Sequence, residues 1–202
     1  MPAKKKETQL PNDIFTEPFE AVLRGLGITT YDFVIVGDGS GNTWEHECGW
    51  ASIALRYNSL ERKVFFGAMN YGSNNTGEMM AYLQPLMWFA AKEQKRRKAP
   101  GAAPRIYSVH ILTDSDYCRG RGTGSGRDFK TNLPFWNLFD MISRQGFQLH
   151  WHWIRRDSFG LNVYADQLSR AARLLVRESQ LQKATEIAGK YPVQVDECNP
   201  FE

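Results

Sequence analysis

Residues 33–40 read Phe-Val-Ile-Val-Gly-Asp-Gly-Ser, an apolar run that ends in glycines and one carboxylate. A short apolar run bounded by glycine is typical of a buried strand that enters a turn. In an α/β domain, side chains at the carboxyl ends of central strands project into a shared crevice where ligands bind. The stretch therefore predicts a central strand that delivers Asp38 to a site.

Patterns along the rest of the chain predict an α/β domain around this strand. Two further strands are expected at residues 50–57 and 63–69, joined by a hairpin connection. Later strands are expected at residues 109–112 and 148–154, and helices after residues 74–76, at 133–145 and at about 162–186. This order predicts a mixed sheet, an antiparallel meander followed by right-handed crossovers, with helices on its faces.

Three segments extend or interrupt these elements. Residues 16–27 predict a short helix that packs on the main domain, and Pro85 predicts a kink or a break in the helix that contains it. Residues 119–132 are rich in Gly, Arg and Lys and predict a mobile loop. We expect an N-terminal tail with a short helix over residues 1–30, the main domain over 31–186, and a C-terminal tail over 187–202.

Composition restricts the class of protein more than its function. The chain has 202 residues, 42% of them hydrophobic, which excludes a disordered protein. A formal net charge of +3 does not by itself identify a nucleic-acid binder. The three cysteines lie far apart, which predicts neither a zinc cluster nor a disulfide framework and indicates the cytoplasm or another reducing compartment. No apolar run approaches the roughly 20 residues that span a bilayer, so no membrane association is expected.

Four acidic residues occupy positions where α/β domains place their chemistry. Asp38 and Asp114 each end an apolar strand, Glu78 opens a helix, and Asp166 lies in the first turns of the last helix. Carboxylates that converge in a desolvated site must take up protons or bind cations. Ligands that are all oxygen suit Mg²⁺ or Mn²⁺, and two such ions about 3.5–4 Å apart can hydrolyse a phosphodiester.

Each carboxylate also has an ordinary structural explanation when it is taken alone. Glu78 in a first helical turn would complement the helix dipole. Asp38 and Asp114 could form turns with the following Gly or Ser, and Asp166 could lie on a solvated helix face. Only the four positions together, each in its local context, favour a metal site.

Four motifs in chain order resemble the ribonuclease H family, and the resemblance covers residues 31 to about 173. The motifs are Val-Gly-Asp-Gly-Ser at 36–40, Asn-Asn-Thr-Gly-Glu-Met-Met-Ala at 74–81, Leu-Thr-Asp-Ser-Asp-Tyr at 112–117 and Asn-Val-Tyr-Ala-Asp-Gln-Leu-Ser-Arg-Ala-Ala at 162–172. The resemblance implies a ribonuclease H-like five-stranded mixed sheet flanked by helices. It also implies an endonuclease that cleaves the RNA strand of an RNA–DNA hybrid with two divalent ions.

The resemblance assigns roles to the four carboxylates. Asp38 would bridge both ions, Glu78 and Asp114 would help to hold the ion nearest the leaving group, and Asp166 would complete the site of the ion that activates water. The implied cofactors are two Mg²⁺ or Mn²⁺ ions. The expected partner is the RNA–DNA hybrid, the expected state is a monomer, and protein partners are left open.

Further residues are candidates for contact with the substrate. Asn74 is the candidate reader of the ribose 2′-hydroxyl. Ser40, Asn75, Arg156 and Asn162 are further candidates for contact with the substrate. Phosphate contacts are expected from the basic residues of the 119–132 segment, with a solvated loop as the alternative: Arg119, Arg121, Arg127 and Lys130.

The chain departs from the family pattern at three places. Residues 155–160 contain no histidine where many members carry one before the last motif. Asp116 stands where Gln is frequent and adds negative charge beside the site. Gly77, directly before Glu78, would loosen the first helical turn. These departures affect the expected rate and substrate preference but remove no metal ligand.

Two other functions are compatible with the same motifs. A nuclease of the same fold, such as a junction resolvase or an exonuclease, could act on DNA. Against an exonuclease, the residue two positions after Asp38 is Ser40 and not the acidic residue that such enzymes use. A catalytically weak or silent relative could serve as a nucleic-acid-binding module, although all four carboxylates are present. His150 and His152 share one face of a predicted strand, either as the polar side of an edge or in contact with substrate.

Overall fold

The computed structural model describes residues 17–42, 47–57, 59, 62–125, 131–178 and 194–195. Its strands are β1 (Phe33–Asn42), β2 (Glu47–Arg56), β3 (Arg62–Met69), β4 (Tyr107–Thr113), β5 (Phe147–Trp153) and β6 (Gln194–Val195). Its helices are α1 (Glu17–Gly25), α2 (Asn74–Arg97), α3 (Asp116–Gly122), α4 (Leu133–Arg144) and α5 (Gly160–Glu178). Every strand and helix that the sequence predicts is therefore present, and residues 179–186 of the last predicted helix lie outside the described residues.

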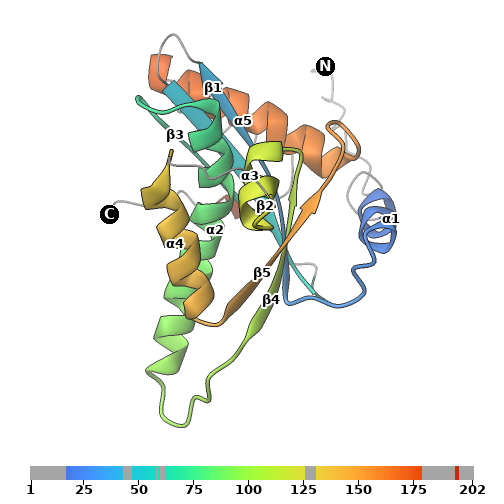
Figure 1. Ribbon diagram of the computed structural model, residues 1–202, viewed down its shortest axis with the longest axis vertical. Helices are drawn as coiled ribbons and strands as arrows, with labels where there is room; N and C mark the ends of the chain where they lie inside the picture. The colour runs from blue at the N-terminus through green and yellow to red at the C-terminus, as the bar shows by residue number, and fades with distance from the viewer. Residues whose placement is uncertain are drawn as a thin grey trace, which may run out of the picture.

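The strands form one mixed sheet in the order β5-β4-β1-β2-β3-β6 (Figure 1). Strands β1, β2 and β3 make an antiparallel meander, while β4 pairs parallel with β1 and β5 parallel with β4. The predicted five-stranded mixed sheet is confirmed. The short β6 pairs parallel with β3 inside the segment predicted as a tail, because a strand of two residues leaves no periodic signal in the sequence.

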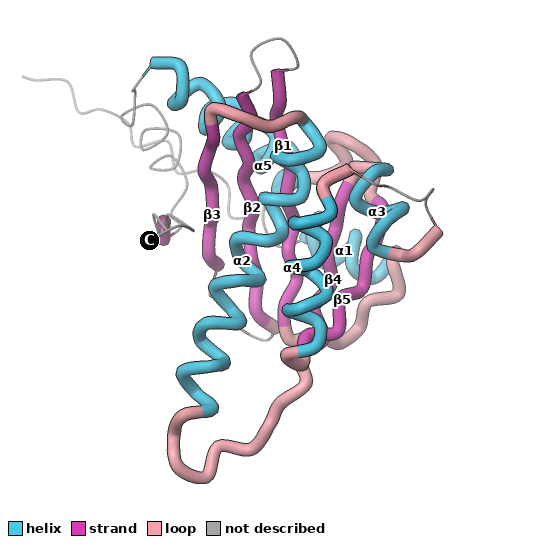
Figure 2. The backbone as a smooth tube through the Cα atoms, turned by 60° about the vertical axis from the view of Figure 1, so that its left-hand side comes forward, coloured by secondary structure: helices cyan, strands magenta, loops and turns pink. Residues whose placement is uncertain are grey.

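Helices cover both faces of the sheet and enclose two apolar cores (Figure 2). Alternate residues of β1 serve the two faces: Ile35 belongs to the core under α2 and α4, whereas Val34 and Val36 belong to the core under α1 and α5. A strand buried on both faces is apolar at every position, which explains the continuous run at 33–36. Helix α1 contributes Phe19 and Leu23 to the second core, as an extension of the main domain.

Glycines of β1 allow helix α2 to pack directly on the strand backbone. A Cβ atom added to Gly39 would lie 2.1 Å from the backbone nitrogen of Glu78, and one added to Gly41 would lie 2.2 Å from that of Asn74. Gly77 has the same role from the helix side, because its Cβ would lie 2.6 Å from the carbonyl oxygen of Gly49. Contacts this short exclude every other residue type at these positions.

The predicted turn at residues 37–40 is wrong. Strand β1 continues to Asn42, and Asp38 pairs with Ala51 of β2 in the middle of the ladder. The Gly-Asp-Gly pattern arises because glycine faces α2 while the intervening residues face α5, and not because the chain reverses. Asp38 therefore lies within a central strand and not at its end.

The predicted loop at 119–132 is wrong over its first part, because α3 includes Arg119 and Arg121. The Ser115 hydroxyl accepts a hydrogen bond from the backbone N–H of Cys118, which caps this helix, and the Cys118 side chain is fully buried. The glycines that suggested a loop are tolerated because the buried side of the short helix packs on the sheet. Residues 126–130 lie outside the described residues.

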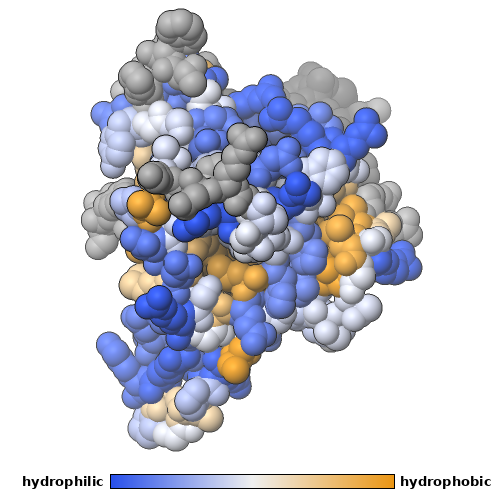
Figure 3. Space-filling view, viewed as in Figure 1, coloured by the Kyte–Doolittle hydropathy of each residue, from blue (hydrophilic) through white to orange (hydrophobic). Residues whose placement is uncertain are grey.

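Helix α2 differs from its prediction in two ways. It runs unbroken through the buried Pro85, because packing against the sheet compensates for the lost helical hydrogen bond. Ser73 caps the helix in a capping box with Thr76, so Glu78 is the fifth residue of the helix and lies beyond its first turn. The last turn is basic, and this end of the molecule is hydrophilic (Figure 3). Within the described part of the chain, no helix has the length and hydropathy needed to cross a membrane.

We expect Gly39→Ala to destabilise the protein by at least about 3 kcal/mol, because the added methyl group must push α2 away from β1. Urea unfolding of purified protein measures the effect. Gly25→Ala is the matched control, since a Cβ atom there meets nothing within 4 Å. Equal stability of the Gly39→Ala and Gly25→Ala proteins would contradict the packing argument.

Candidate active site

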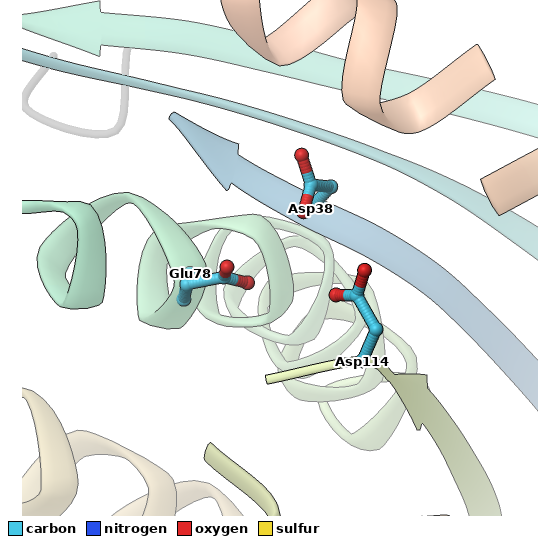
Figure 4. Close-up of side chains that lie close together, drawn as sticks. All are labelled: Asp38, Glu78 and Asp114. Atoms are coloured by element: carbon cyan, nitrogen blue, oxygen red, sulfur yellow. The ribbon is translucent and has the colours of Figure 1, made fainter. Parts of the chain in front are cut away.

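Three of the four predicted carboxylates meet between the two helical layers. Asp38 comes from the middle of β1, Glu78 from α2, and Asp114 from the residue directly after β4. Each offers a carboxylate oxygen, and these oxygens lie within 4.8 Å of one another (Figure 4). Among the described residues, this is the only group of three or more histidine, cysteine or acidic side chains whose ligand atoms already lie this close together.

Two oxygens of the group are buried without a hydrogen bond from the described residues: Asp38 Oδ1 and Glu78 Oε2. The other Asp38 oxygen accepts a hydrogen bond of 3.0 Å from the Ser169 hydroxyl. The other Glu78 oxygen lies 3.4 Å from the side-chain nitrogen of Asn74. Buried carboxylate oxygens require a partner, and a cation would supply one for both.

Burial and mutual repulsion raise the pKa values of all three acids. Burial, followed by the charge of Asp114, raises the pKa of Asp38 from 3.8 to about 7. Burial and the charges of Asp38 and Asp114 raise the pKa of Glu78 well above its ordinary value. Burial also raises the pKa of Asp114, and the nearby charge of Arg156 partly offsets this. Without a cation, the site therefore holds protons near neutral pH.

The fourth predicted carboxylate, Asp166 of α5, is bound by arginine and is not part of the close group. Arg170 donates to Asp166 Oδ1 from two nitrogens at 2.8 and 3.1 Å. Arg156 lies 3.5 Å from the same oxygen and 3.6 Å from Asp114 Oδ2. Burial acts to lower the pKa of Arg156, but the carboxylates outweigh it and raise that pKa overall. Arg156 thus places a permanent positive charge between Asp114 and Asp166.

The close group fits a hard divalent cation such as Mg²⁺ or Mn²⁺. All its ligands are oxygen atoms, and two of them are unpaired in the described structure. Asp38, Glu78 and Asp114 would hold such an ion. Asp166 would need to exchange at least part of its arginine contacts before it could hold a second one.

Several predicted substrate residues surround this group. Asn74 is exposed, and its side-chain oxygen accepts a hydrogen bond from the backbone N–H of Gly41 at 3.1 Å. Ser40 and Asn75 are partly buried, while the buried Asn162 makes a side-chain hydrogen bond to Asp114. Their contact with substrate stays a prediction.

Only two of the four basic residues expected to contact phosphate lie within the described structure. Arg119 is exposed and pairs with Asp116 at 3.3 Å, and the Arg121 guanidinium lies 5.9 Å from the ring centre of Trp136. Arg127 and Lys130 lie outside the described residues. Phosphate contact by these four residues also stays a prediction.

Sequence reasoning overlooked Ser169 and Arg170 as parts of the site. They follow Asp166 by three and four residues, which places all three on one side of α5. That spacing could have revealed Arg170 as a partner of Asp166. The contact of Ser169 with Asp38 depends on how α5 crosses β1, and no local pattern contains it.

We expect Asp38→Asn to stabilise the metal-free protein at pH 8. The folded state binds more protons than the unfolded state between pH 3.8 and about 7, so wild-type stability falls as the pH rises through this window. Removing the charge should increase the free energy of unfolding by roughly 1–3 kcal/mol at pH 8 in chelator. Urea unfolding at several pH values measures this.

The exposed Asp116→Asn provides the control for this substitution and should change stability little. The gain in Asp38→Asn should disappear below pH 3.8, where both states are protonated. An Asp38→Asn protein no more stable than wild type at pH 8 would refute the account of a destabilising buried charge.

We expect Arg156→Ala to increase the affinity for Mn²⁺ in the absence of nucleic acid, because the guanidinium repels a cation held beside Asp114. A gain of roughly threefold to tenfold is expected from the loss of one nearby charge. Calorimetric titration at pH 8 measures it. The neighbouring Arg155→Ala is the control, and equal affinities in the two variants would show that the charge of Arg156 does not reach the ion.

Comparison with known proteins identifies the fold. No protein-family model and no curated protein matches the chain. One similar structure is the N-terminal ribonuclease H domain of a Mycobacterium tuberculosis protein, solved as a fusion with maltose-binding protein. It is 19% identical, with a TM-score of 0.57, and the match covers 74% of this chain and 99% of that chain. LC11-RNase H1 in complex with an RNA/DNA hybrid is 16% identical, with a TM-score of 0.58 over 72% and 99%.

A second structure of LC11-RNase H1, an enzyme isolated from compost by a metagenomic approach, is 17% identical. Its TM-score is 0.57 over 74% of this chain and all of that chain. Identities this low are evidence of shared architecture only, and the three structures agree in that architecture. The chain has the ribonuclease H-like fold, as its four motifs indicate.

Proposed function

We propose that this chain is a divalent-metal-dependent endonuclease that cleaves the RNA strand of RNA–DNA hybrids. The observation that carries the proposal is the buried group of Asp38, Glu78 and Asp114, with oxygens within 4.8 Å and unpaired oxygens on two of the three residues. Such a group is costly for the fold unless it binds cations, so its presence favours a metal-dependent reaction. The likeness to ribonuclease H domains, one of them solved with an RNA/DNA hybrid, supports the choice of substrate.

The proposed reaction is hydrolysis of a phosphodiester with two Mg²⁺ or Mn²⁺ ions. When bound, such ions activate a water molecule and stabilise the leaving oxygen. Asp38, Glu78 and Asp114 would hold the first ion, and Asp166, which is now paired with Arg156 and Arg170, would contribute to the second. Ser169 fixes the orientation of the Asp38 carboxylate through its hydrogen bond.

Arg156 belongs to the segment that lacks the loop histidine of many ribonuclease H members, and it lies beside the carboxylates. It touches both Asp114 and Asp166, so the segment after β5 faces the site even though it lacks histidine. Because Arg156 remains charged at working pH, it stabilises the ionised carboxylates and the phosphate charge without carrying a proton. Asn74, exposed beside Glu78, discriminates ribose from deoxyribose.

We expect Asp114→Asn to reduce hybrid cleavage by at least about a thousandfold while hybrid affinity stays the same or rises. The substitution keeps the shape of the side chain and removes one charge from the metal ligands. The assay measures cleavage of labelled RNA–DNA hybrid, duplex DNA and duplex RNA, each with and without Mg²⁺ or Mn²⁺. Asp140→Asn, which changes an exposed carboxylate on α4, should cleave at close to the wild-type rate.

Three outcomes would contradict the proposal. Wild-type cleavage in excess chelator would exclude the metal mechanism. Preferential cleavage of duplex DNA would replace it with a DNA-directed nuclease of the same fold. Hybrid binding without cleavage in either metal would make the chain a nucleic-acid-binding module.

A further inference from the structure

Three of the chain's four histidines gather on one face of neighbouring strands. His110 of β4 and His150 of β5 are register partners in the parallel ladder, and His152 lies two residues further along β5. Alternate residues of a strand share a face, so all three rings lie on the same side of the sheet. Strand β5 is the edge strand of the sheet there.

The histidine cluster is separate from the carboxylates. His110 precedes Asp114 by four positions along the chain, or about 13 Å in an extended strand. None of the proposed nuclease residues belongs to the cluster.

The rings of His110 and His152 approach through their nitrogen atoms. His110 Nδ1 lies 2.9 Å from His152 Nε2, and the two ring planes differ by only 16°. The ring of His150 stacks on that of His110, with centres 4.7 Å apart. A nitrogen-to-nitrogen contact this short holds either one shared proton or one shared cation, since two protonated nitrogens cannot face each other.

The spacing is close to that of imidazoles on one metal ion. Two nitrogens at about 2.05 Å from a tetrahedral zinc ion lie about 3.3 Å apart, so the observed pair needs to open by about 0.4 Å. The exposed His150 can supply a third nitrogen by turning its ring out of the stack. Two histidines at alternate positions of one strand and a third on its neighbour thus lie on one side of the sheet, and the third ligand is gained only when His150 turns.

The state of the rings suits metal binding. Ser108 Oγ lies 3.2 Å from His110 Nε2, the nitrogen that faces away from His152, and such a second partner holds a ligating imidazole in place. Burial, together with the charges of His150 and His152, lowers the pKa of His110 to about 4. Burial and His150 also lower the pKa of His152. Both rings are therefore neutral at pH 7, and the neutral imidazole is the form that binds metals.

We propose that His110, His150 and His152 form a second metal site, which takes a borderline transition-metal ion of the zinc class. Nitrogen ligands select such ions, whereas the oxygen ligands around Asp38 select Mg²⁺ or Mn²⁺. A bound ion links β5 to β4 through side chains. This inference does not rest on the proposed nuclease function.

The proposal is tested by calorimetric titration of the full chain with Zn²⁺ at pH 7.5. Excess Mg²⁺ is present so that the carboxylates are saturated. We expect one zinc site in the wild-type protein and at least a tenfold loss of affinity in His110→Ala and in His152→Ala. His150→Ala should lose less, because its ring must turn to reach the ion. His46→Ala, which removes the one histidine outside the cluster, is the control and should bind zinc as the wild type does.

A second measurement does not depend on any variant. Addition of Zn²⁺ to the wild-type protein should shift the imidazole ¹⁵N resonances of three histidines and leave the fourth unchanged. Zinc affinity that is unaffected by His110→Ala and His152→Ala, or ¹⁵N resonances that do not move, would overturn the proposal. The pair would then be a structural N–H···N hydrogen bond.

Discussion

The lack of a Cβ atom at Gly39 and Gly41, where α2 packs on β1, is the constraint on which the rest of the site depends. Gly39 and Gly41 allow the helix backbone to rest on the strand backbone, which brings Glu78 to the level of Asp38. The second helical layer follows the same rule, because a Cβ atom on Gly49 would lie 2.4 Å from the carbonyl oxygen of Ser169. That contact places the Ser169 hydroxyl on Asp38. Two helices thus meet one carboxylate from opposite faces of the sheet, and both approaches require glycine.

This arrangement concentrates negative charge where water is excluded, and neighbouring groups only partly compensate for it. Ser169 donates to Asp38, and Arg156 supplies a cation to Asp114. Tyr82 supports the backbone beneath the site: its hydroxyl donates to the Gly37 carbonyl at 2.7 Å and lies 3.4 Å from the Leu112 carbonyl. It thereby ties β1 to β4, the two strands that position Asp38 and Asp114. These contacts fix the backbone around a site whose carboxylates lack a full set of hydrogen-bond partners. Binding sites are commonly supported in this way by the residues around them.

The sequence predicts the elements better than their local geometry. The apolar runs and helical stripes locate each main strand and helix, because these patterns follow directly from burial on one or two faces. The turn expected at Asp38 is wrong. Glycine is equally suited to a reversal of the chain and to close packing of a helix on a strand, and the sequence of a single chain does not distinguish the two. Helix α3 was missed because its glycines and arginines resemble a loop, while its burial depends on the sheet. The contacts of Arg156 and Ser169, and the meeting of His110 with His152, join residues distant in the chain, so no local pattern contains them.

The two apolar cores draw on different parts of the chain, and this affects how the protein folds during synthesis. The core under α2 and α4 is built from residues between Phe33 and Trp151. The core under α1 and α5 also needs Ile154 to Leu168, which leave the ribosome later. Until then Val34, Val36 and Ile53 present an uncovered apolar face, the kind of surface on which nascent chains aggregate or recruit chaperones. Helix α5 thus has to be in place before the second core and the hydrogen bond from Ser169 to Asp38 are complete.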